Sequence, residues 1–237
     1  MRFGKIGAKR MMWRNPYVTD GLVAWWDGIW NAGFGVHDSN AMSWKDLVRG
    51  IDCPYSDSST PQWGNNCCQF PYTGINQGKF FVTSLPAGLN NQNGGSTIEL
   101  VFRRTSSLRG TIFGGSQYGT APDIAVHCGV SDTYSIYVYN LTAGTDAAPM
   151  NQIVKMTHLR DSRNLTIRCG GKSNSMTADS YYFRGVASGL KMNIGCDADG
   201  YYNNCGDIYS LRLYSRILTS SEQSANDAAD RIRFNLS

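Results

Sequence analysis

The chain has 237 residues, of which 41% are hydrophobic and 17% are charged, and this composition excludes an intrinsically disordered protein. The formal net charge is only +4 and much of the surplus falls in the first stretch, so no nucleic-acid-binding face is expected on the folded body. No apolar run approaches the length of a membrane span, so no transmembrane segment is expected either.

Residues 1–19 are predicted to form a basic N-terminal arm. The stretch has no acid before Asp20, and its cationic residues are Arg2, Lys5, Lys9, Arg10 and Arg14. It never runs seven apolar residues together, as the core of a signal peptide would, so we expect synthesis in the cytoplasm without such a peptide. We interpret the arm as a contact for a partner subunit, and residues 20–237 as a single domain.

From residue 20 onward, short β-rich runs alternate with turn residues. The first is the apolar run GLVAWWDG at 21–28, and a loop rich in Ser, Pro, Asp and Asn is predicted at 52–66. Further strands are predicted at 67–70, 78–83, 96–104, 111–116, 123–130, 134–140, 153–160, 165–171, 190–195 and 206–216. Many short strands separated by turn signals are typical of a β-sandwich or barrel.

Two of these runs alternate clearly enough to predict which side chains share a face. In the run at 96–104, Ile98, Leu100 and Phe102 lie on one face, opposite Glu99 and Arg103. In the run at 206–216, the predicted faces are Ile208, Ser210, Arg212 and Tyr214 on one side and Tyr209, Leu211 and Leu213 on the other.

One helix is predicted, near the C-terminus. Thr219 and Glu222 have the spacing of a capping box, which marks the start of a helix. The residues that recur at helical spacing, and so predict its apolar face, are Ala225, Ala228, Ala229 and Ile232. The expected fold is therefore all-β, with two antiparallel sheets in a jelly-roll sandwich and one short C-terminal helix.

Several segments resemble the laminin-G-like family of concanavalin A-like lectins and glucanases. The closing segment GDIYSLRLYSRILTSSEQSAN matches the family pattern at Gly206, Ile208, Tyr214, Arg216, Leu218, Thr219, Glu222 and Asn226. The opening GLVAWWDG, the later Trp44 to Leu47, and LKMNIG at 190–195 resemble other strands of the family. The turn RCGGK departs from the family's Tyr-x-Asn-Gly, although Gly170 and Gly171 keep the turn chemistry. The resemblance implies the jelly-roll sandwich, and it extends to short members of the family that phages and prophages encode.

The sequence offers no clear catalytic group. Glucanases of the resembled fold carry Glu-x-Asp-x-x-Glu, whereas this chain has only Glu99 and Glu222, far apart in sequence. No pair among His37, His127 and His158 has ligand spacing, and Gly-x-Ser-x-Gly is absent. His127 and His158 lie in predicted strands, where a structural role is expected. We therefore expect that the chain is not an enzyme.

The resemblance also implies a calcium ion at the rim of the sandwich. Asp197 and Asp199 are the candidate ligands, with Asn203 beside them, because hard cations prefer oxygen ligands. The alternative is an ordinary polar loop at 196–204.

Aromatic and polar loop residues favour a saccharide as the partner. Sugar rings stack on aromatic planes, while Asp and Asn accept hydrogen bonds from their hydroxyls. The candidate ligand-binding residues are Trp26, Asp27, Trp30, Tyr201, Tyr202 and Asn203. The alternative is a place in the core, which we expect for one of the pair Trp25 and Trp26.

The chain has seven cysteines and no C-x-x-C pair, which argues against a structural zinc site. Mostly free and buried thiols are expected, and the alternative is a disulfide between Cys196 and Cys205.

The leading hypothesis is a carbohydrate- or surface-binding, lectin-like module that serves as an adhesin on a phage particle. Residues 1–19 would contact other virion subunits, and the protein would lie in the virion or outside the cell after release. One alternative is a structural protein for virion decoration or assembly. The other is a polysaccharide hydrolase of the same fold, in which paired Asp side chains such as Asp27, Asp197 and Asp199 replace the Glu pair.

Overall fold

The computed structural model describes the chain from residue 15 onward, in several ranges. They are residues 15–56, 61–70, 78–82, 95–106, 110–114, 125–128, 134–138, 141–145, 149–161, 164–177, 192–195 and 206–236. For Thr111 and for the strands between 125 and 145, only the backbone is described.

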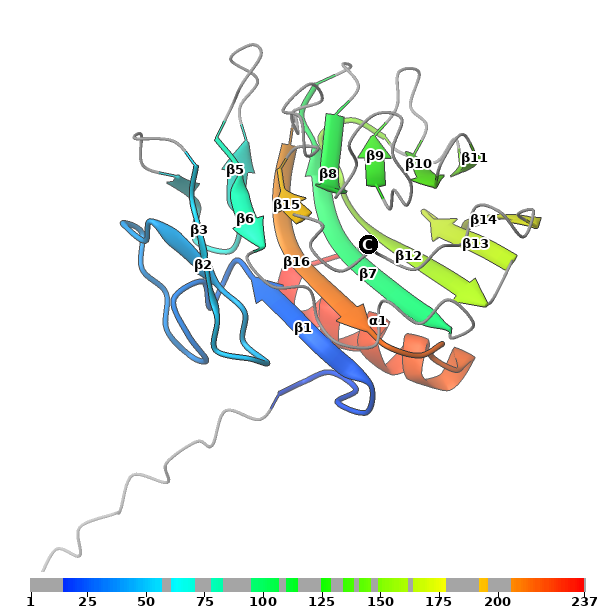
Figure 1. Ribbon diagram of the computed structural model, residues 1–237, viewed down its shortest axis with the longest axis horizontal. Coiled ribbons are helices and arrows are strands. Elements are labelled where there is room, and N and C mark those ends of the chain that lie inside the picture. Colours follow the sequence, from blue (N-terminus) through cyan, green and yellow to red (C-terminus); the bar gives the residue numbers. More distant parts are fainter. Residues whose placement is uncertain are drawn as a thin grey trace, which may run out of the picture.

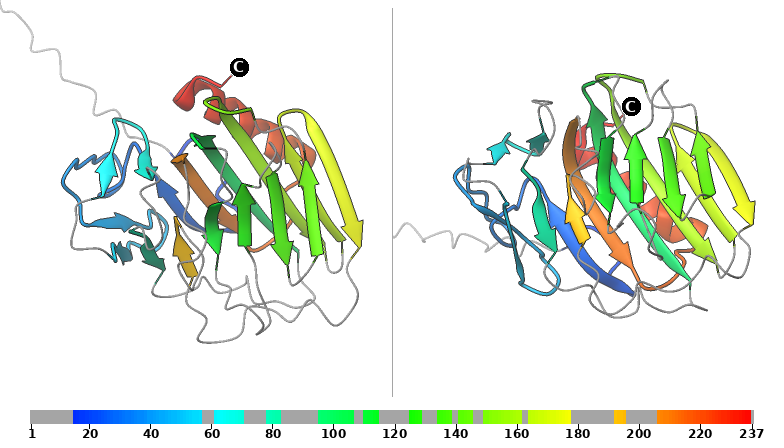
Figure 2. Two further views of the ribbon diagram at one scale, coloured as in Figure 1. Left: turned by 90° about the horizontal axis from the view of Figure 1, so that it is seen from above. Right: turned by 45° about the horizontal axis from the view of Figure 1, so that its top comes forward.

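Two antiparallel sheets form a sandwich (Figures 1 and 2). The first has the order β14 (Lys172–Thr177), β13 (Asn164–Cys169), β12 (Ile153–Asp161), β7 (Ser96–Arg104), β16 (Gly206–Tyr214), β5 (Cys68–Phe70) and β4 (Gln62–Trp63), and β1 (Leu22–Asp27) pairs with β16. The second has the order β11 (Leu141–Thr145), β10 (Tyr134–Val138), β9 (Ala125–Cys128), β8 (Gly110–Gly114), β15 (Met192–Ile194) and β6 (Phe80–Val82). A small sheet pairs β2 (Ser43–Lys45) with β3 (Asp52–Pro54). The predicted all-β sandwich is confirmed.

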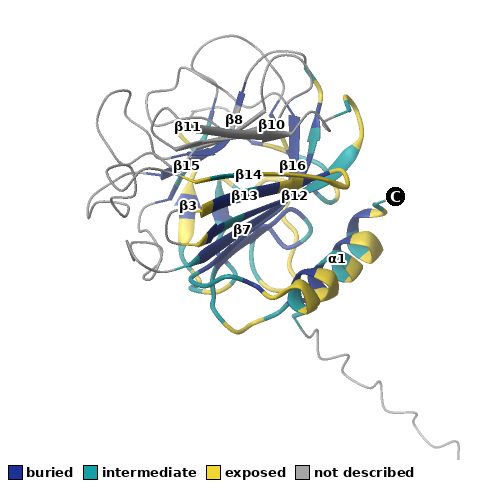
Figure 3. Ribbon diagram, turned by 90° about the vertical axis from the view of Figure 1, so that its right-hand side faces the viewer, coloured by how far each residue is buried: buried dark blue, intermediate teal, exposed yellow. Residues whose placement is uncertain are grey.

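Helix α1 (Ser220–Phe234) lies on the outer face of the first sheet, away from the second sheet (Figure 3). The molecule therefore has three layers, and the central strands of the first sheet, β7 and β16, are buried on both faces. In the described part of the chain, no helix combines the length and the apolar character that crossing a membrane requires.

The main core fills the space between the two sheets. As predicted, Ile98, Leu100 and Phe102 of β7 all point into it, and Glu99 points outward to the helix. The second sheet contributes Phe80, Val82, Ile112, Phe113, Met192 and Ile194. Burying these apolar faces stabilises the sandwich, because each large side chain removed from water contributes about 1.5–3 kcal/mol.

The predicted alternation in β16 holds only from Ser210 to Tyr214, because the strand contains a bulge. Its register against β7 shifts between Ile208 and Ser210. Ile208 packs in the sandwich core with Leu211, whereas Tyr209 and Ser210 both face the helix side. The predicted grouping of Ile208 with Ser210 is therefore wrong, since one extra residue in a strand moves the side chains beyond it to the opposite face.

Helix α1 begins with the predicted capping box, but it buries a different face from the predicted one. The Thr219 hydroxyl accepts a hydrogen bond from the Glu222 N–H, and the Glu222 carboxylate accepts one from the Thr219 N–H. The buried residues are Gln223, Asn226, Asp230 and Phe234. Ile232, predicted for the apolar face, is 86% exposed. These mostly polar residues of α1 face the sheet because the sheet below the helix presents charged side chains.

A buried polar network joins α1 to the first sheet. The Arg212 guanidinium of β16 donates to Asp230 at 2.5 and 2.8 Å and to Glu99 at 3.0 Å. The Asn226 amide donates to Glu99 at 2.7 Å and to the Tyr214 hydroxyl at 2.9 Å. Burial alone raises the pKa of Asp230, but the charge and hydrogen bonds of Arg212 outweigh it and hold that pKa below its usual value. A buried charge without its partner would be costly, so these pairs fix where the helix docks.

The last residues of the predicted arm lie on the domain. Tyr17 packs edge-on against Trp25, with ring centroids 5.1 Å apart, and its hydroxyl donates to Asp230 at 2.7 Å. The Val18 N–H donates to the Asn226 side-chain oxygen at 2.9 Å. These contacts hold the segment before β1 against both β1 and α1.

The four cysteines whose side chains are described are buried and form no disulfide, as expected. They are Cys53, Cys67, Cys68 and Cys169. Cys196 and Cys205, the alternative disulfide pair, lie outside the described residues.

Candidate functional site

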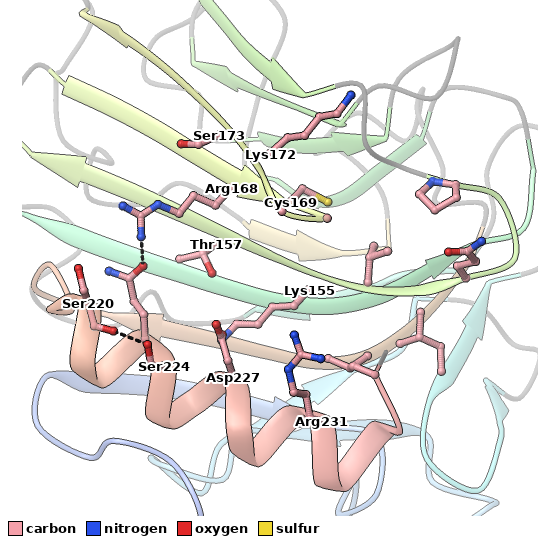
Figure 4. Close-up of a pocket in the computed structure, with 18 residues that line it drawn as sticks. Lys155, Thr157, Arg168, Cys169, Lys172, Ser173, Ser220, Ser224, Asp227 and Arg231 are labelled. Carbon is pink, nitrogen blue, oxygen red and sulfur yellow. Dashed lines mark hydrogen bonds and ion pairs between the residues drawn. The ribbon is translucent and has the colours of Figure 1, made fainter.

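A groove of about 730 Å³ lies between α1 and the outer face of β12, β13 and β14 (Figure 4). We call it the helix–sheet groove. Its lining is mostly polar, with hydroxyls from Thr157, Ser173 and Ser224 and amides from Gln152 and Gln223. The charged side chains that line it are Lys155, Arg168, Lys172, Asp227 and Arg231. Cations thus outnumber acids along its walls.

Strand pairing places one row of side chains across the groove. Thr157 lies opposite Glu99 on one side and Arg168 on the other, and Arg168 lies opposite Ser173. Directly paired residues point to the same face of a sheet, so this whole row faces α1. Burial falls from Glu99 to Ser173, so the groove opens toward the β13–β14 edge.

The β13–β14 hairpin bounds the groove through a two-residue turn. Gly170 and Gly171 have φ of 54° and 79°. A two-residue hairpin loop of this kind needs positive φ at both positions, which glycine adopts without strain. The sequence predicted this turn from the same two glycines, and the pairing of Cys169 with Lys172 confirms it.

Lys155 lies between the sheet and the helix, and its charge is neutralised there. Its ammonium group is 2.8 Å from Glu99, pairs with Asp227, and lies 3.3 Å from Asp230. Lys155 therefore belongs to the network that docks α1, and its charge is already matched by carboxylates.

Two arginines present their charge to the groove, Arg168 from β13 and Arg231 from α1 (Figure 4). Arg168 donates to the Gln223 side-chain oxygen at 2.7 Å, and the Gln223 amide donates to the Leu218 carbonyl at 2.7 Å. Arg168 forms no ion pair within the described ranges, and Arg231 forms neither an ion pair nor a hydrogen bond with any described residue.

Trp26, predicted to contact a ligand, lies in the sandwich core. It is 0% exposed, and its indole N–H donates to the Cys53 sulfur at 3.2 Å. Trp25 is buried on the opposite face of β1, where its indole N–H donates to the Ser210 hydroxyl at 3.2 Å. Both faces of β1 are covered, so the expected stacking of Trp26 on a sugar is not possible in this structure.

Asp27 and Trp30 are also buried, and their contacts are structural. Asp27 accepts the N–H groups of Ile29 and Trp30 at 3.0 and 3.1 Å and pairs with Arg233 of α1 at 2.7 Å. Arg233 lies over the Trp30 ring, 4.3 Å from its centroid. Burial raises the pKa of Asp27 to about 6, although Arg233 and the two N–H groups lower it. These contacts anchor the end of α1 to the turn after β1, and no ligand reaches the Asp27 carboxylate.

The remaining predicted site residues lie outside the described residues. They are Tyr201, Tyr202 and Asn203 for the ligand and Asp197 and Asp199 for calcium. Within the described ranges, no group of three or more His, Cys, Asp or Glu side chains could hold a metal ion. Calcium binding stays a prediction.

The two glutamates occupy separate structural positions, as their sequence context indicated. Glu99 is buried in the network below α1. Glu222 caps the helix and pairs with Arg216 at 2.6 Å, and this arginine, with the N–H of Thr219, lowers the pKa of Glu222 to about 2. Neither carboxylate lines the helix–sheet groove.

The sequence-based prediction missed the groove because its lining comes from separate stretches of the chain. They are residues 149–157, 168–173 and 220–236. The available signal was modest: Arg168 and Lys172 flank the predicted Gly-Gly turn, and Arg231 lies in the predicted helix.

Comparison with known proteins finds likeness in structure. No protein-family model matches the chain, and no curated protein matches its sequence. A Trypanosoma rangeli sialidase in complex with sialic acid has a TM-score of 0.64 at 13% identity, over 90% of this chain and 33% of the sialidase. The same sialidase with 2,3-difluorosialic acid also has a TM-score of 0.64 at 13% identity, over 90% and 34%. The CBM40 of a Ruminococcus gnavus IT-sialidase, bound to α2,3-sialyllactose, has a TM-score of 0.50 at 12% identity, over 61% of this chain and 88% of that one. The likeness shows a shared β-sandwich fold.

This comparison corrects the expectation that the chain is not an enzyme. The T. rangeli sialidases that match this chain over about a third of their length are enzymes, and this finding conflicts with the expectation drawn from the missing Glu-x-Asp-x-x-Glu pattern. The chain spans about a third of the length of those sialidases.

Proposed function

We propose that the chain is a carbohydrate-binding module whose saccharide lies in the helix–sheet groove. The observation that carries this proposal is the groove itself, with a volume of about 730 Å³ and a lining of hydroxyl, amide and guanidinium groups. Ligand sites typically occupy about 300–1,000 Å³, and convergent polar groups give them specificity. The fold is shared with a module bound to α2,3-sialyllactose, which supports a sugar as the ligand.

The lining suits a saccharide in its apolar as well as its polar parts. Ile153 and Leu236 lie along the groove beside the hydrogen-bonding groups, and can contact the C–H faces of a sugar ring. Thr157 and Ser173 each supply a hydroxyl, which both donates and accepts, as a sugar hydroxyl does. Among the described residues the groove has no aromatic lining, so its contacts differ from the aromatic stacking that the sequence suggested.

A blocking substitution tests the proposal. Ser224 lines the groove from an exposed position on α1, and Ala228 is an exposed α1 residue outside the lining. Binding to a panel of neutral and acidic saccharides is measured by calorimetry for the wild type and for Ser224→Trp and Ala228→Trp. We expect Ser224→Trp to weaken binding about tenfold or more and Ala228→Trp to leave it unchanged. A panel without any binder, or equal effects of the two variants, would overturn the proposal.

The laminin-G-like assignment, calcium binding and a place on a phage particle as an adhesin belong to this proposal as its finer parts. All three rest on the sequence resemblance. A protein on a phage particle would lie outside the cell once the particle is released. Finding the protein in purified particles would test the adhesin. The alternative of a pure decoration protein requires residues 1–19 to be ordered only by another subunit, whereas Tyr17 and Val18 are held by the chain's own α1.

The likeness to sialidases makes hydrolysis of a saccharide the second candidate function. The test is to incubate the protein with sialyllactose and with neutral polysaccharides and to measure released sugar. Release that survives purification to homogeneity would establish an enzyme. Binding without release from any of these substrates would count against this candidate.

A further inference from the structure

Resting on this proposed function, we propose that the groove selects acidic saccharides, with carboxylate or sulfate groups of the ligand bound by Arg168 and by Arg231. Both arginines line the groove, one on β13 and the other on α1, so a ligand lying along it meets a guanidinium from the sheet and one from the helix (Figure 4).

The charged residues of the groove favour an anionic ligand. Among the described charged residues that line it, Asp227 is the one carboxylate, and it pairs with Lys155. Glu99 and Asp230 also face Lys155, so the acids near the groove are committed to the docking network. Arg168 and Arg231 have no carboxylate partner among the described residues. A ligand anion would supply the missing counter-charge.

The Arg168 guanidinium is held in a fixed orientation by Gln223. Gln223 is buried, its amide is fixed on the Leu218 carbonyl, and its oxygen accepts one N–H of Arg168. One terminal nitrogen is thus occupied, and the remaining N–H groups of the guanidinium have no partner among the described residues. A guanidinium held in this way is prepared for the two-point contact that it makes with carboxylates and related oxyanions. Gln223 is therefore a positioning residue.

The ligand's charge is tested with matched saccharides. Calorimetry compares 3′-sialyllactose, 3′-sulfolactose and lactose, and compares oligogalacturonate with its fully methyl-esterified form. We expect each acidic member that binds to do so at least about tenfold more tightly than its neutral counterpart, and to lose this advantage as salt is raised. The first set separates carboxylate from sulfate recognition, because both acids share one neutral parent.

Substitutions assign the effect to the two arginines. Arg168→Gln and Arg231→Gln should each lower affinity for oligogalacturonate about tenfold and leave its methyl-esterified form unchanged. Lys79→Gln, which removes a cation outside the lining, is the control and should change neither. Gln223→Leu should also reduce the preference for the acidic member. Combined with Arg168→Gln, it should add nothing further, an outcome that a merely structural role of Gln223 does not produce.

The outcomes of these experiments distinguish failure of the acidic preference from failure of the proposed carbohydrate-binding function. Equal binding of acidic and neutral members, with blocking by Ser224→Trp, would overturn the acidic preference and leave the carbohydrate module standing. A preference for acids that survives both arginine substitutions would also overturn it. No binding of any saccharide would remove the proposed function itself.

Discussion

At the scale of single residues, His158 is a buried histidine in the core between the two sheets. It lies opposite Ile98 and Ile167 on the inner face of the first sheet and is 1% exposed. Neither ring nitrogen has a hydrogen-bond partner among the residues that the structure describes. Burial, with a smaller contribution from the charge of Arg160, lowers the pKa of His158 to about 3. The imidazole therefore stays neutral in the folded protein, as the structural role expected for this residue requires.

This burial predicts a loss of stability in acid. Below pH 6.5 the unfolded chain binds a proton at His158 that the folded chain does not bind until about pH 3, so stability falls as pH falls through that window. Between pH 6.5 and 5 the loss from this residue is about 2 kcal/mol. His158→Leu should remove this loss. At pH 7.5 it should leave the protein equally stable or about 1 kcal/mol more stable, because unpaired buried nitrogens disappear.

Urea unfolding of the wild type and His158→Leu at pH 7.5 and pH 5 measures this effect. His37→Leu is the matched control, because His37 is exposed, and it should keep the wild-type pH dependence. An unchanged pH dependence in His158→Leu would contradict the assignment.

At the scale of elements, the docking of α1 depends on charge pairs rather than on an apolar stripe. Asp230→Asn would remove one of the two carboxylate partners of the fully buried Arg212, leaving Glu99 alone, and should cost about 3 kcal/mol of unfolding free energy. Asp227→Asn is the control on the same helix, since this side chain is 49% exposed and should cost less than about 1 kcal/mol. Urea denaturation of both variants measures the difference, and equal costs would show that the network does not anchor the helix.

The features of the elements that depend on neighbouring residues in the sequence were predicted correctly. The features that depend on contacts with another strand or layer were missed. The capping box of Thr219 and Glu222 needs only adjacent residues, and it was found. The alternation in β7 was also found, because the strand keeps its register. The bulge at Tyr209 depends on the pairing with β7, and the exposure of Ile232 depends on what the sheet below α1 presents. Neither can be deduced from a period in the sequence.

At the scale of the whole molecule, the site could not be deduced because the fold assembles it. Thr157 and Arg168 come together through strand register, and Arg231 joins them only because α1 docks across those strands. By contrast, Trp26 and Asp27 are adjacent in sequence and resemble a sugar site, yet both are covered by neighbouring layers. Residues that are adjacent in sequence can have the composition of a binding site. Whether they can contact a ligand depends on whether another layer of the fold covers them.

Tyr17 and Val18 contact α1, and this couples the segment before β1 to the groove. The Tyr17 ring lies against the Arg212 guanidinium, 3.8 Å away, and its hydroxyl donates to Asp230 of the helix. The opposite side of α1 carries Ser224 and Arg231 into the groove. Removing the contacts of Tyr17 with α1 should therefore disturb the groove wall as well as destabilise the fold.

A comparison of chains that begin at residue 15 and at residue 20 tests this coupling. Loss of the buried Tyr17 ring should cost about 3–5 kcal/mol, as an aromatic truncation in a core does. Tyr17→Phe should cost only about 2 kcal/mol, because it loses one hydrogen bond to a charged group and keeps the ring. Thermal unfolding ranks the three proteins, and calorimetry with the best saccharide of the panel should rank them in the same order. Equal melting temperatures for the two chains would show that α1 stays docked without this segment. Unequal stability with equal affinity would show instead that the groove wall does not depend on it.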